Sequence, residues 1–207
     1  MNILVSGVGG QGVILFSDLL ASVALAAGLD VKKSEVHGMA QRGGSVTSHV
    51  RYGTRVLSPI VEDGTADLVV AFEKLEAVRW VHALGPGGRL AYDSYRWDPL
   101  PVMLGLVERP DDRQLDERLR NRAPNLVVVP AFEVAGALGN TRVQNVVMFG
   151  AVSRFLEFPA SAYQAAIRTL VKPEHVELNL AAFERGLALS RPAATTPDGR
   201  GATPPAV

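Results

Sequence analysis

A glycine-rich stretch near the start of the chain constrains the fold more than any other feature. The residues Gly7-Val-Gly-Gly-Gln-Gly12 follow an apolar run at positions 3–5 and precede an apolar-periodic segment that extends to about Ala27. A strand, a glycine turn and a helix in this order let the backbone bend tightly and leave free N–H groups at the helix start, where an anion is favoured. The stretch therefore predicts an α/β domain organised around this turn.

The pattern further along the chain predicts how that domain is completed. Short apolar segments alternate with helical periodicity to about residue 130, and helical segments then follow one another. This order predicts a Rossmann-like three-layer α/β domain with a mainly parallel sheet and a helical C-terminal part. The weakly apolar second strand, at 29–36, is expected near a sheet edge. Residues 45–60, which alternate around Gly53-Thr54, predict a β-hairpin insertion, and Val102–Leu106 is a further candidate strand.

Composition limits the classes of function. The 207 residues are expected to form one domain over 1–190 and a disordered tail over 191–207, which is rich in Pro, Ala, Thr and Gly. Lys plus Arg and Asp plus Glu number 21 each, so net charge makes no case for nucleic acid or membrane binding. The absence of cysteine excludes disulfides and cysteine-ligated iron–sulfur clusters from this chain. With no signal-peptide pattern or membrane-spanning run, we expect a cytoplasmic protein.

The glycine turn has two interpretations. Gly7, Gly9 and Gly12 satisfy the G-x-G-x-x-G pattern of dinucleotide-binding domains, which also requires an acidic residue near the end of the second strand. Glu35 is the candidate for that residue. Alternatively, the glycines allow the helix to pack close to the sheet or another chain to approach. Gln11 can read a ligand or a partner subunit through its amide, or can be an ordinary loop residue.

A second polar, glycine-rich stretch, His37-Gly-Met-Ala-Gln-Arg-Gly-Gly44, follows the second strand. His37 can serve as a base and Arg42 can bind a phosphate or carboxylate, although an exposed loop with ordinary polar residues is the alternative. Since both stretches follow strands, we expect them at one edge of the sheet, with binding rather than chemistry as their function. The candidate cofactor-binding residues are Gly7, Gly9, Gly10, Gln11, Gly12, His37, Arg42, Gly43 and Gly44.

The remaining polar residues form no catalytic pattern. His49, His82 and His175 lack metal-ligand spacing and are interpreted as structural or exposed. The segment 111–122 mixes charges of both signs at helical spacing and is interpreted as a solvated helix face. Asn140 or Thr141 is expected to cap a helix. We therefore predict no catalytic residue and no metal ligand.

Taken together, the two glycine-rich stretches resemble the gamma-type subunit or domain of the 2-oxoacid:ferredoxin oxidoreductases. The resemblance rests on Gly7–Gly12, on Glu35–Val46 and on His49-Val-Arg51 at this spacing. It continues through Asp67–Glu73 and Leu138–Ala151 and covers roughly residues 1 to 185. Within that family the likeness is to the beta subunit of indolepyruvate ferredoxin oxidoreductase.

The resemblance implies a subunit of an enzyme that converts a 2-oxoacid of the indolepyruvate or aryl-pyruvate type to acyl-CoA, CO₂ and reduced ferredoxin. It implies that thiamine diphosphate and the iron–sulfur clusters belong to a large partner subunit, which agrees with the absence of cysteine here. This chain is then expected to form the subunit interface and to share a coenzyme A site, with Arg42 near a phosphate. The isolated chain is expected to expose an apolar patch or to self-associate. A free-standing NAD(P)- or FAD-binding Rossmann oxidoreductase and a ligand-free partner module are the alternatives.

Overall fold

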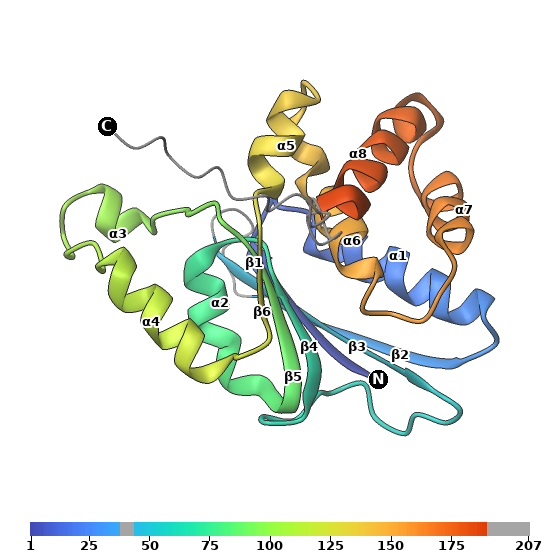
Figure 1. Ribbon diagram of the computed structural model, residues 1–207, viewed down its shortest axis with the longest axis horizontal. Coiled ribbons are helices and arrows are strands. Elements are labelled where there is room, and N and C mark those ends of the chain that lie inside the picture. Colours follow the sequence, from blue (N-terminus) through green and yellow to red (C-terminus); the bar gives the residue numbers. More distant parts are fainter. Residues whose placement is uncertain (38–43, 190–207) are drawn as a thin grey trace, which may run out of the picture.

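The computed structural model describes residues 1–37 and 44–189 (Figure 1). The strands are β1 (Asn2–Val8), β2 (Asp30–His37), β3 (Ser45–Gly53), β4 (Ala66–Ala71), β5 (Leu84–Asp93) and β6 (Leu126–Val129). The helices are α1 (Val13–Ala26), α2 (Lys74–Trp80), α3 (Leu100–Met103), α4 (Asp112–Arg122), α5 (Ala131–Ala137), α6 (Gln144–Ser153), α7 (Ala160–Leu170) and α8 (Val176–Leu189). Short 3₁₀ turns occupy Val81–Ala83 (η1), Thr141–Val143 (η2) and Pro173–His175 (η3).

The strands form one six-stranded sheet in the order β2-β3-β1-β4-β5-β6. β1, β4, β5 and β6 are parallel, whereas β3 is antiparallel to both of its neighbours, β1 and β2. Helices α2 and α4 cover one face of the sheet, and α1, α6, α7 and α8 lie on the other (Figure 1). The predicted three-layer α/β class is confirmed, and β2 lies at a sheet edge as expected.

The antiparallel insertion is real, but its predicted pairing is wrong. β3 pairs with β2, from Asp30 opposite Gly53 to His37 opposite Val46, and residues 55–60 form no strand. Polar contacts hold those residues as a loop instead, since the Val56 N–H donates to the Asp30 carboxylate over 2.8 Å. The connection of the hairpin is therefore the second glycine-rich stretch rather than Gly53-Thr54.

The candidate strand Val102–Leu106 is also wrong. Helix α3 occupies Leu100–Met103, where the N–H groups of Val102 and Met103 both donate to the Pro99 carbonyl oxygen. A proline in the first turn costs a helix no hydrogen bond, so Pro101 does not oppose this turn. The apolar residues that suggested a strand point largely to solvent, with Leu106 74% exposed.

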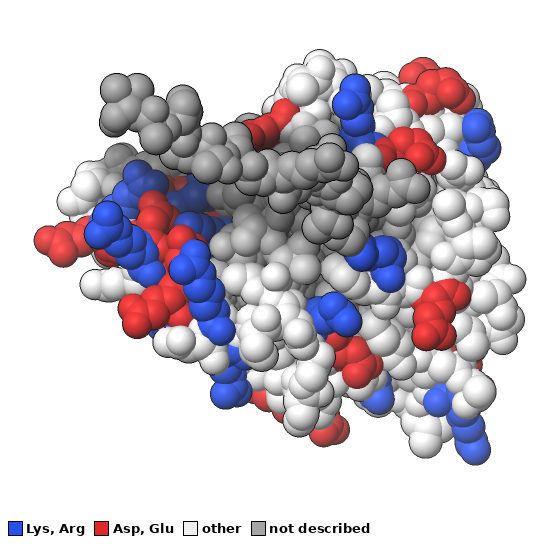
Figure 2. Space-filling model, viewed as in Figure 1, with Lys and Arg blue, Asp and Glu red and all other residues white. Residues whose placement is uncertain are grey.

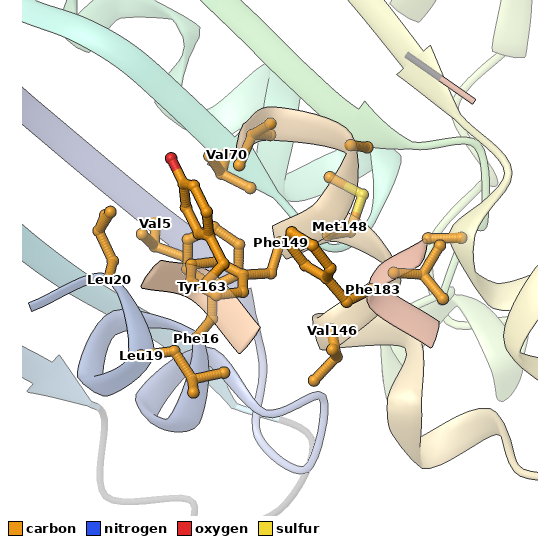
Figure 3. Close-up of a cluster of buried hydrophobic side chains, with 14 of the residues drawn as sticks. Val5, Phe16, Leu19, Leu20, Val70, Val146, Met148, Phe149, Tyr163 and Phe183 are labelled. Carbon is orange, nitrogen blue, oxygen red and sulfur yellow. The ribbon is translucent and has the colours of Figure 1, made fainter. Parts of the chain in front are cut away.

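The larger core lies between the sheet and the helices of the C-terminal part. Phe16 of α1 meets Phe149 of α6 edge to face, with ring centroids 5.4 Å apart, and Tyr163 and Phe183 extend this aromatic cluster (Figure 3). Helices α6 and α8 approach backbone to backbone because Gly186 faces the Val147 carbonyl, only 2.0 Å from where a Cβ atom would lie. This packing attaches the helical C-terminal part firmly to the α/β sheet.

The surface agrees with the charge pattern of the sequence. Lys, Arg, Asp and Glu alternate over α4, which confirms the predicted solvated face of mixed sign (Figure 2). In residues 1–37 and 44–189, every helix is too short or too polar to cross a membrane.

Candidate functional site

The two glycine-rich stretches meet at the carboxyl end of β1. The Gly9 N–H donates to the Gly44 carbonyl oxygen over 2.8 Å, and Val8 pairs with Ser45 where β1 and β3 begin to run together. The predicted proximity of the two stretches is therefore confirmed. His37 ends β2, whereas Arg42 and Gly43 lie outside the described residues.

Gln11 has a role within the turn itself. Its side-chain Oε1 accepts the Val8 N–H over 2.7 Å, and its Nε2 donates to the Phe72 carbonyl oxygen over 3.2 Å. The side chain thus ties the turn to the end of β4, and both polar atoms of its amide have protein partners. Its proposed role in reading a ligand or a partner remains a prediction. A ligand or partner that bound this amide would have to replace these internal hydrogen bonds.

The glycines of the turn differ in what they permit. A Cβ atom on Gly7 would lie 2.8 Å from the Val13 side chain, and one on Gly12, at φ +82°, would lie 2.4 Å from the Asn145 side chain. Both glycines therefore allow close packing inside the chain. Gly10, at φ +105°, has open space where its Cβ atom would be, so the backbone is accessible there.

A cavity of about 160 Å³ opens beside the turn. It lies where the strand order reverses between β1 and β4, the position at which open α/β sheets bind ligands. Its lining combines Gly9 and Gly10 of the turn with aromatic residues and Arg142. Its described lining is Val8, Gly9, Gly10, Gln11, Tyr95, Trp97, Phe132, Thr141, Arg142 and Gln144.

The aromatic wall of the cavity was absent from the sequence-based candidates. Tyr95 and Phe132 stack with centroids 3.9 Å apart and an interplanar angle of 17°, and Trp97 meets Tyr95 edge to face. Tyr95 and Trp97 follow β5, whereas Phe132 is the second residue of α5. In the sequence, the one indication that these aromatic residues could meet was that both segments follow strands of the parallel sheet, whose carboxyl ends share one edge.

A buried carboxylate holds the backbone of this wall in place. Asp93, at 0% exposure, accepts hydrogen bonds from the Tyr95 N–H (3.0 Å), the Phe132 N–H (2.8 Å) and the Gln144 side chain (2.8 Å). Burial raises the pKa of Asp93 to about 6, against the lowering effect of these donors. One side chain therefore connects β5, α5 and α6 through residues that line the cavity.

Two further buried acids, Glu73 and Glu76, lie at the N-terminal end of α2. Glu73 caps α2 by accepting from the backbone of Leu75 and Glu76, and burial raises its pKa to about 7. Glu76 accepts from the Ser45 hydroxyl over 2.7 Å and pairs with Arg79, and burial raises its pKa as well. Glu76 therefore holds Ser45, the first residue of β3, which directly follows the second stretch.

The geometry does not favour a dinucleotide site at the glycine turn. A dinucleotide fold needs the acidic residue on the strand next to β1, but β3 lies between β1 and β2. Glu35 pairs instead with Lys33, whose Nζ lies 2.6 Å from its carboxylate. Glu35 is therefore paired with a lysine on β2, two strands away from β1 and its glycine turn.

Two other polar residues singled out in the sequence, His49 and Asn140, have structural roles. The His49 ring, 7% exposed, accepts the Val61 N–H over 3.1 Å, and burial lowers its pKa. Asn140 caps η2 by accepting the Arg142 N–H, as predicted. Within the described part of the chain, no cluster of three or more His, Asp or Glu side chains has the geometry to hold a metal ion.

Comparison with known proteins places the whole described chain in one family. The family model of the pyruvate ferredoxin/flavodoxin oxidoreductases matches residues 2–189. The chain is 37% identical over 196 residues to the indolepyruvate oxidoreductase subunit IorB of Thermococcus kodakarensis, which covers 92% of this chain and 96% of the relative.

Two solved structures share the fold at 23% identity. One is the gamma subunit of a keto/oxoacid ferredoxin oxidoreductase from Geobacter sulfurreducens, with a TM-score of 0.67 over 91% of this chain and 97% of that chain. The other is the 2-oxoglutarate:ferredoxin oxidoreductase from Magnetococcus marinus, with a TM-score of 0.70 over 92% of this chain but 31% of that chain. The fold thus occurs both as a separate subunit and as part of a longer chain. The protein belongs to the pyruvate ferredoxin/flavodoxin oxidoreductase family.

Proposed function

We propose that this chain is the small, gamma-type subunit of a 2-oxoacid:ferredoxin oxidoreductase of the indolepyruvate or aryl-pyruvate type. The observation that supports this most strongly is the 37% identity to an indolepyruvate oxidoreductase subunit over nearly the full length of both chains. The complete enzyme converts the 2-oxoacid and coenzyme A to acyl-CoA and CO₂ and passes the electrons to ferredoxin.

The composition of this chain decides which cofactors are assigned to a partner subunit in this proposal. Because the chain has no cysteine, it cannot hold cysteine-ligated iron–sulfur clusters, and we assign these clusters and thiamine diphosphate to a large partner subunit. Bound there, these groups supply the decarboxylation chemistry and the electron path. This chain has no catalytic centre in the proposal, and its own residues hold the partner and shape the edge of the site.

An exposed apolar segment supports docking to a partner. Met103 ends α3, and Leu104, Leu106 and Val107 follow it. These four side chains are 59%, 62%, 74% and 56% exposed. Large aliphatic side chains grouped this way on a surface are typical of interaction sites. We propose that this segment is covered in the complete enzyme.

The two glycine-rich stretches are our candidate for a shared coenzyme A site. The open backbone at Gly10 lets a phosphate approach, and Arg42 in the second stretch supplies a cation in the proposal. Gly9 and Gly44 hold the two stretches together by their hydrogen bond. Gly7, Gln11 and Gly12 contribute indirectly here, because they hold the shape of the turn.

Two measurements test the proposal. Co-expression with the large, cysteine-rich thiamine-binding subunit should yield a stable complex, whereas isolation of this chain as a free protein that binds NAD(H) or NADP(H) would support the Rossmann alternative. In the assembled enzyme, Arg42→Ala should weaken coenzyme A binding by about 10-fold or more, as expected for loss of a charge-assisted hydrogen bond. Arg113→Ala, on the exposed face of α4, is the matched control. Unchanged coenzyme A affinity and turnover in Arg42→Ala would reject the role of Arg42.

A further inference from the structure

We propose that a cluster of ion pairs around Arg96 holds the exposed apolar segment in position for the large subunit, so that the affinity between the two chains depends on Arg96. The cluster, called the Arg96 clasp below, consists of Arg96, Asp98, Arg109 and Asp112. The partner in this inference rests on the proposed function, whereas the clasp follows from contacts within this chain.

The clasp closes a long connection between β5 and α4. This connection, residues 94–111, carries α3, which lies at the outer edge of the molecule next to the start of α4 (Figure 1). Arg96 lies near one end of the connection, and Asp112 is the first residue of α4 at the other end. A contact between these two residues therefore joins the two ends, and the apolar segment lies between them.

Arg96 makes the central contacts of the clasp. Its Nε donates to the Asp98 carboxylate over 2.7 Å, and its Nη1 donates to the Asp112 carboxylate over 2.9 Å and to the Pro110 carbonyl oxygen over 3.1 Å. The Arg96 side chain is only 7% exposed, so these charge-assisted hydrogen bonds are weakly screened by solvent. One guanidinium group thus holds both ends of the connection.

Two further cations complete and anchor the clasp. Arg109 approaches from the far end of the connection, with nitrogen atoms 3.4 Å from the Asp98 carboxylate and 3.5 Å from that of Asp112. Lys74, the first residue of α2, lies 3.4 Å from Asp112 and 2.9 Å from Asp116. The clasp is therefore attached to α2, one of the helices that cover the sheet.

Apolar burial does not hold the apolar segment in place. Every residue from 103 to 114 is exposed, including the four aliphatic side chains of the segment. Charged groups of the clasp face inward while aliphatic groups face solvent, which is the reverse of ordinary loop packing. Because a region with few buried apolar contacts opens at a low cost in free energy, we infer that the ion pairs determine how well the segment is ordered.

Order before docking affects affinity. A segment that is already fixed loses less conformational entropy when it binds than one that must first be ordered. If the binding conformation is populated only part of the time, the apparent affinity falls in proportion to that fraction. Loss of the clasp should therefore weaken the complex although every aliphatic side chain of the segment is still present.

Hydrogen exchange of the full chain without its partner tests the clasp itself. The N–H groups of Val102 and Met103 donate to the Pro99 carbonyl oxygen, so their exchange reports the order of the connection. Arg96→Met should accelerate this exchange by about 10-fold or more and leave the exchange of β4 unchanged. Arg118→Met, at an exposed position on α4, is the matched control and should change neither.

The affinity of the full chain for the large subunit tests the role of the clasp in docking. Arg96→Met should weaken the complex by about 10-fold or more. Leu106→Ala should weaken it by about 5-fold or more in the wild-type chain but by less than about 2-fold in the Arg96→Met chain, because a released segment no longer presents Leu106. A residue that stabilised only the rest of the fold would give independent effects, so this non-additivity identifies Arg96 as a positioning residue.

A second variant keeps the test valid if Arg96→Met does not fold. Arg109→Gln removes a clasp side chain that is 58% exposed and should give the same pattern with smaller changes. Unchanged exchange at Val102 and Met103 in these variants overturns the inference, and so does an additive loss of affinity with Leu106→Ala.

The same experiments separate this inference from the proposed function. If the wild-type chain and the large subunit form no complex, the proposed function fails and the inference fails with it. If they form a complex that Arg96→Met and Arg109→Gln enter as tightly as the wild type, the inference alone is overturned.

Discussion

The backbone N–H of Gly9 donates to the carbonyl oxygen of Gly44 over 2.8 Å and joins two stretches that are far apart in the sequence. The first stretch is held from inside by Gln11, and the second is held at its end by the hydrogen bond between Ser45 and Glu76. The two stretches therefore meet at one edge of the sheet. Gln11 anchors the first stretch, and Glu76 holds Ser45, the residue that directly follows the second. The following predictions test the parts of this arrangement.

The first prediction concerns the amide of Gln11. Gln11→Ala leaves the Val8 N–H and the Phe72 carbonyl oxygen without this partner and should lower the free energy of unfolding by about 1–3 kcal/mol. Urea unfolding of the full chain measures this loss. Gln114→Ala, at an exposed position on α4, should change stability by less than about 0.5 kcal/mol. Equal stability of the two variants would show that the Gln11 amide does not hold the turn.

The second prediction concerns the contact between α6 and α8. Gly186→Ala places a Cβ atom against the Val147 carbonyl oxygen, so the helices must separate or shift, at a cost of about 2 kcal/mol or more. Gly53→Ala makes the same substitution where no atom lies within 4 Å of the new Cβ, and should change stability by less than about 1 kcal/mol. Thermal or urea unfolding distinguishes them, and a Gly186→Ala chain as stable as wild type would contradict this packing.

The third prediction concerns the pH dependence of stability. The pKa of Asp93 is raised from 3.8 to about 6 and that of Glu73 from 4.5 to about 7, so the folded chain binds more protons than the unfolded chain in this window. These groups therefore favour the folded state at low pH, and their contribution is lost as pH rises from about 4 to about 7.

Asp93→Asn removes one of these protonation equilibria. We expect its free energy of unfolding, measured in urea between about pH 4 and about pH 7.5, to fall less steeply with pH than that of the wild type. The comparison of slopes remains valid even if the variant is less stable at every pH. Identical slopes for Asp93→Asn and wild type would mean that this carboxyl titrates normally in the folded chain.

Local patterns predicted much of this fold but not the pairing of its strands. The alternation in Ser45–Gly53 correctly indicated a strand, and the short Gly53-Thr54 turn suggested a partner at 55–60. The actual partner is β2, which lies across a longer glycine-rich connection. The Asp30 side chain, which holds Val56 in the loop, is distant in sequence and therefore invisible to a local pattern.

The same limit applies to the candidate site. The glycine turn after β1 could be recognised locally, because its conformation is encoded by adjacent residues. The support under the cavity could not, since Asp93 meets Phe132 and Gln144 only after the sheet has formed. The binding roles of His37 and Arg42 remain predictions.

The central claim is that this chain functions as the small subunit of a 2-oxoacid:ferredoxin oxidoreductase. The most direct measurement is the rate of ferredoxin reduction by the purified large subunit with indolepyruvate and coenzyme A, before and after addition of this chain. We predict that addition forms a stable complex and produces coenzyme A-dependent reduction that neither chain shows alone. No complex, together with no change in the rate at saturating concentrations of this chain, would contradict the claim.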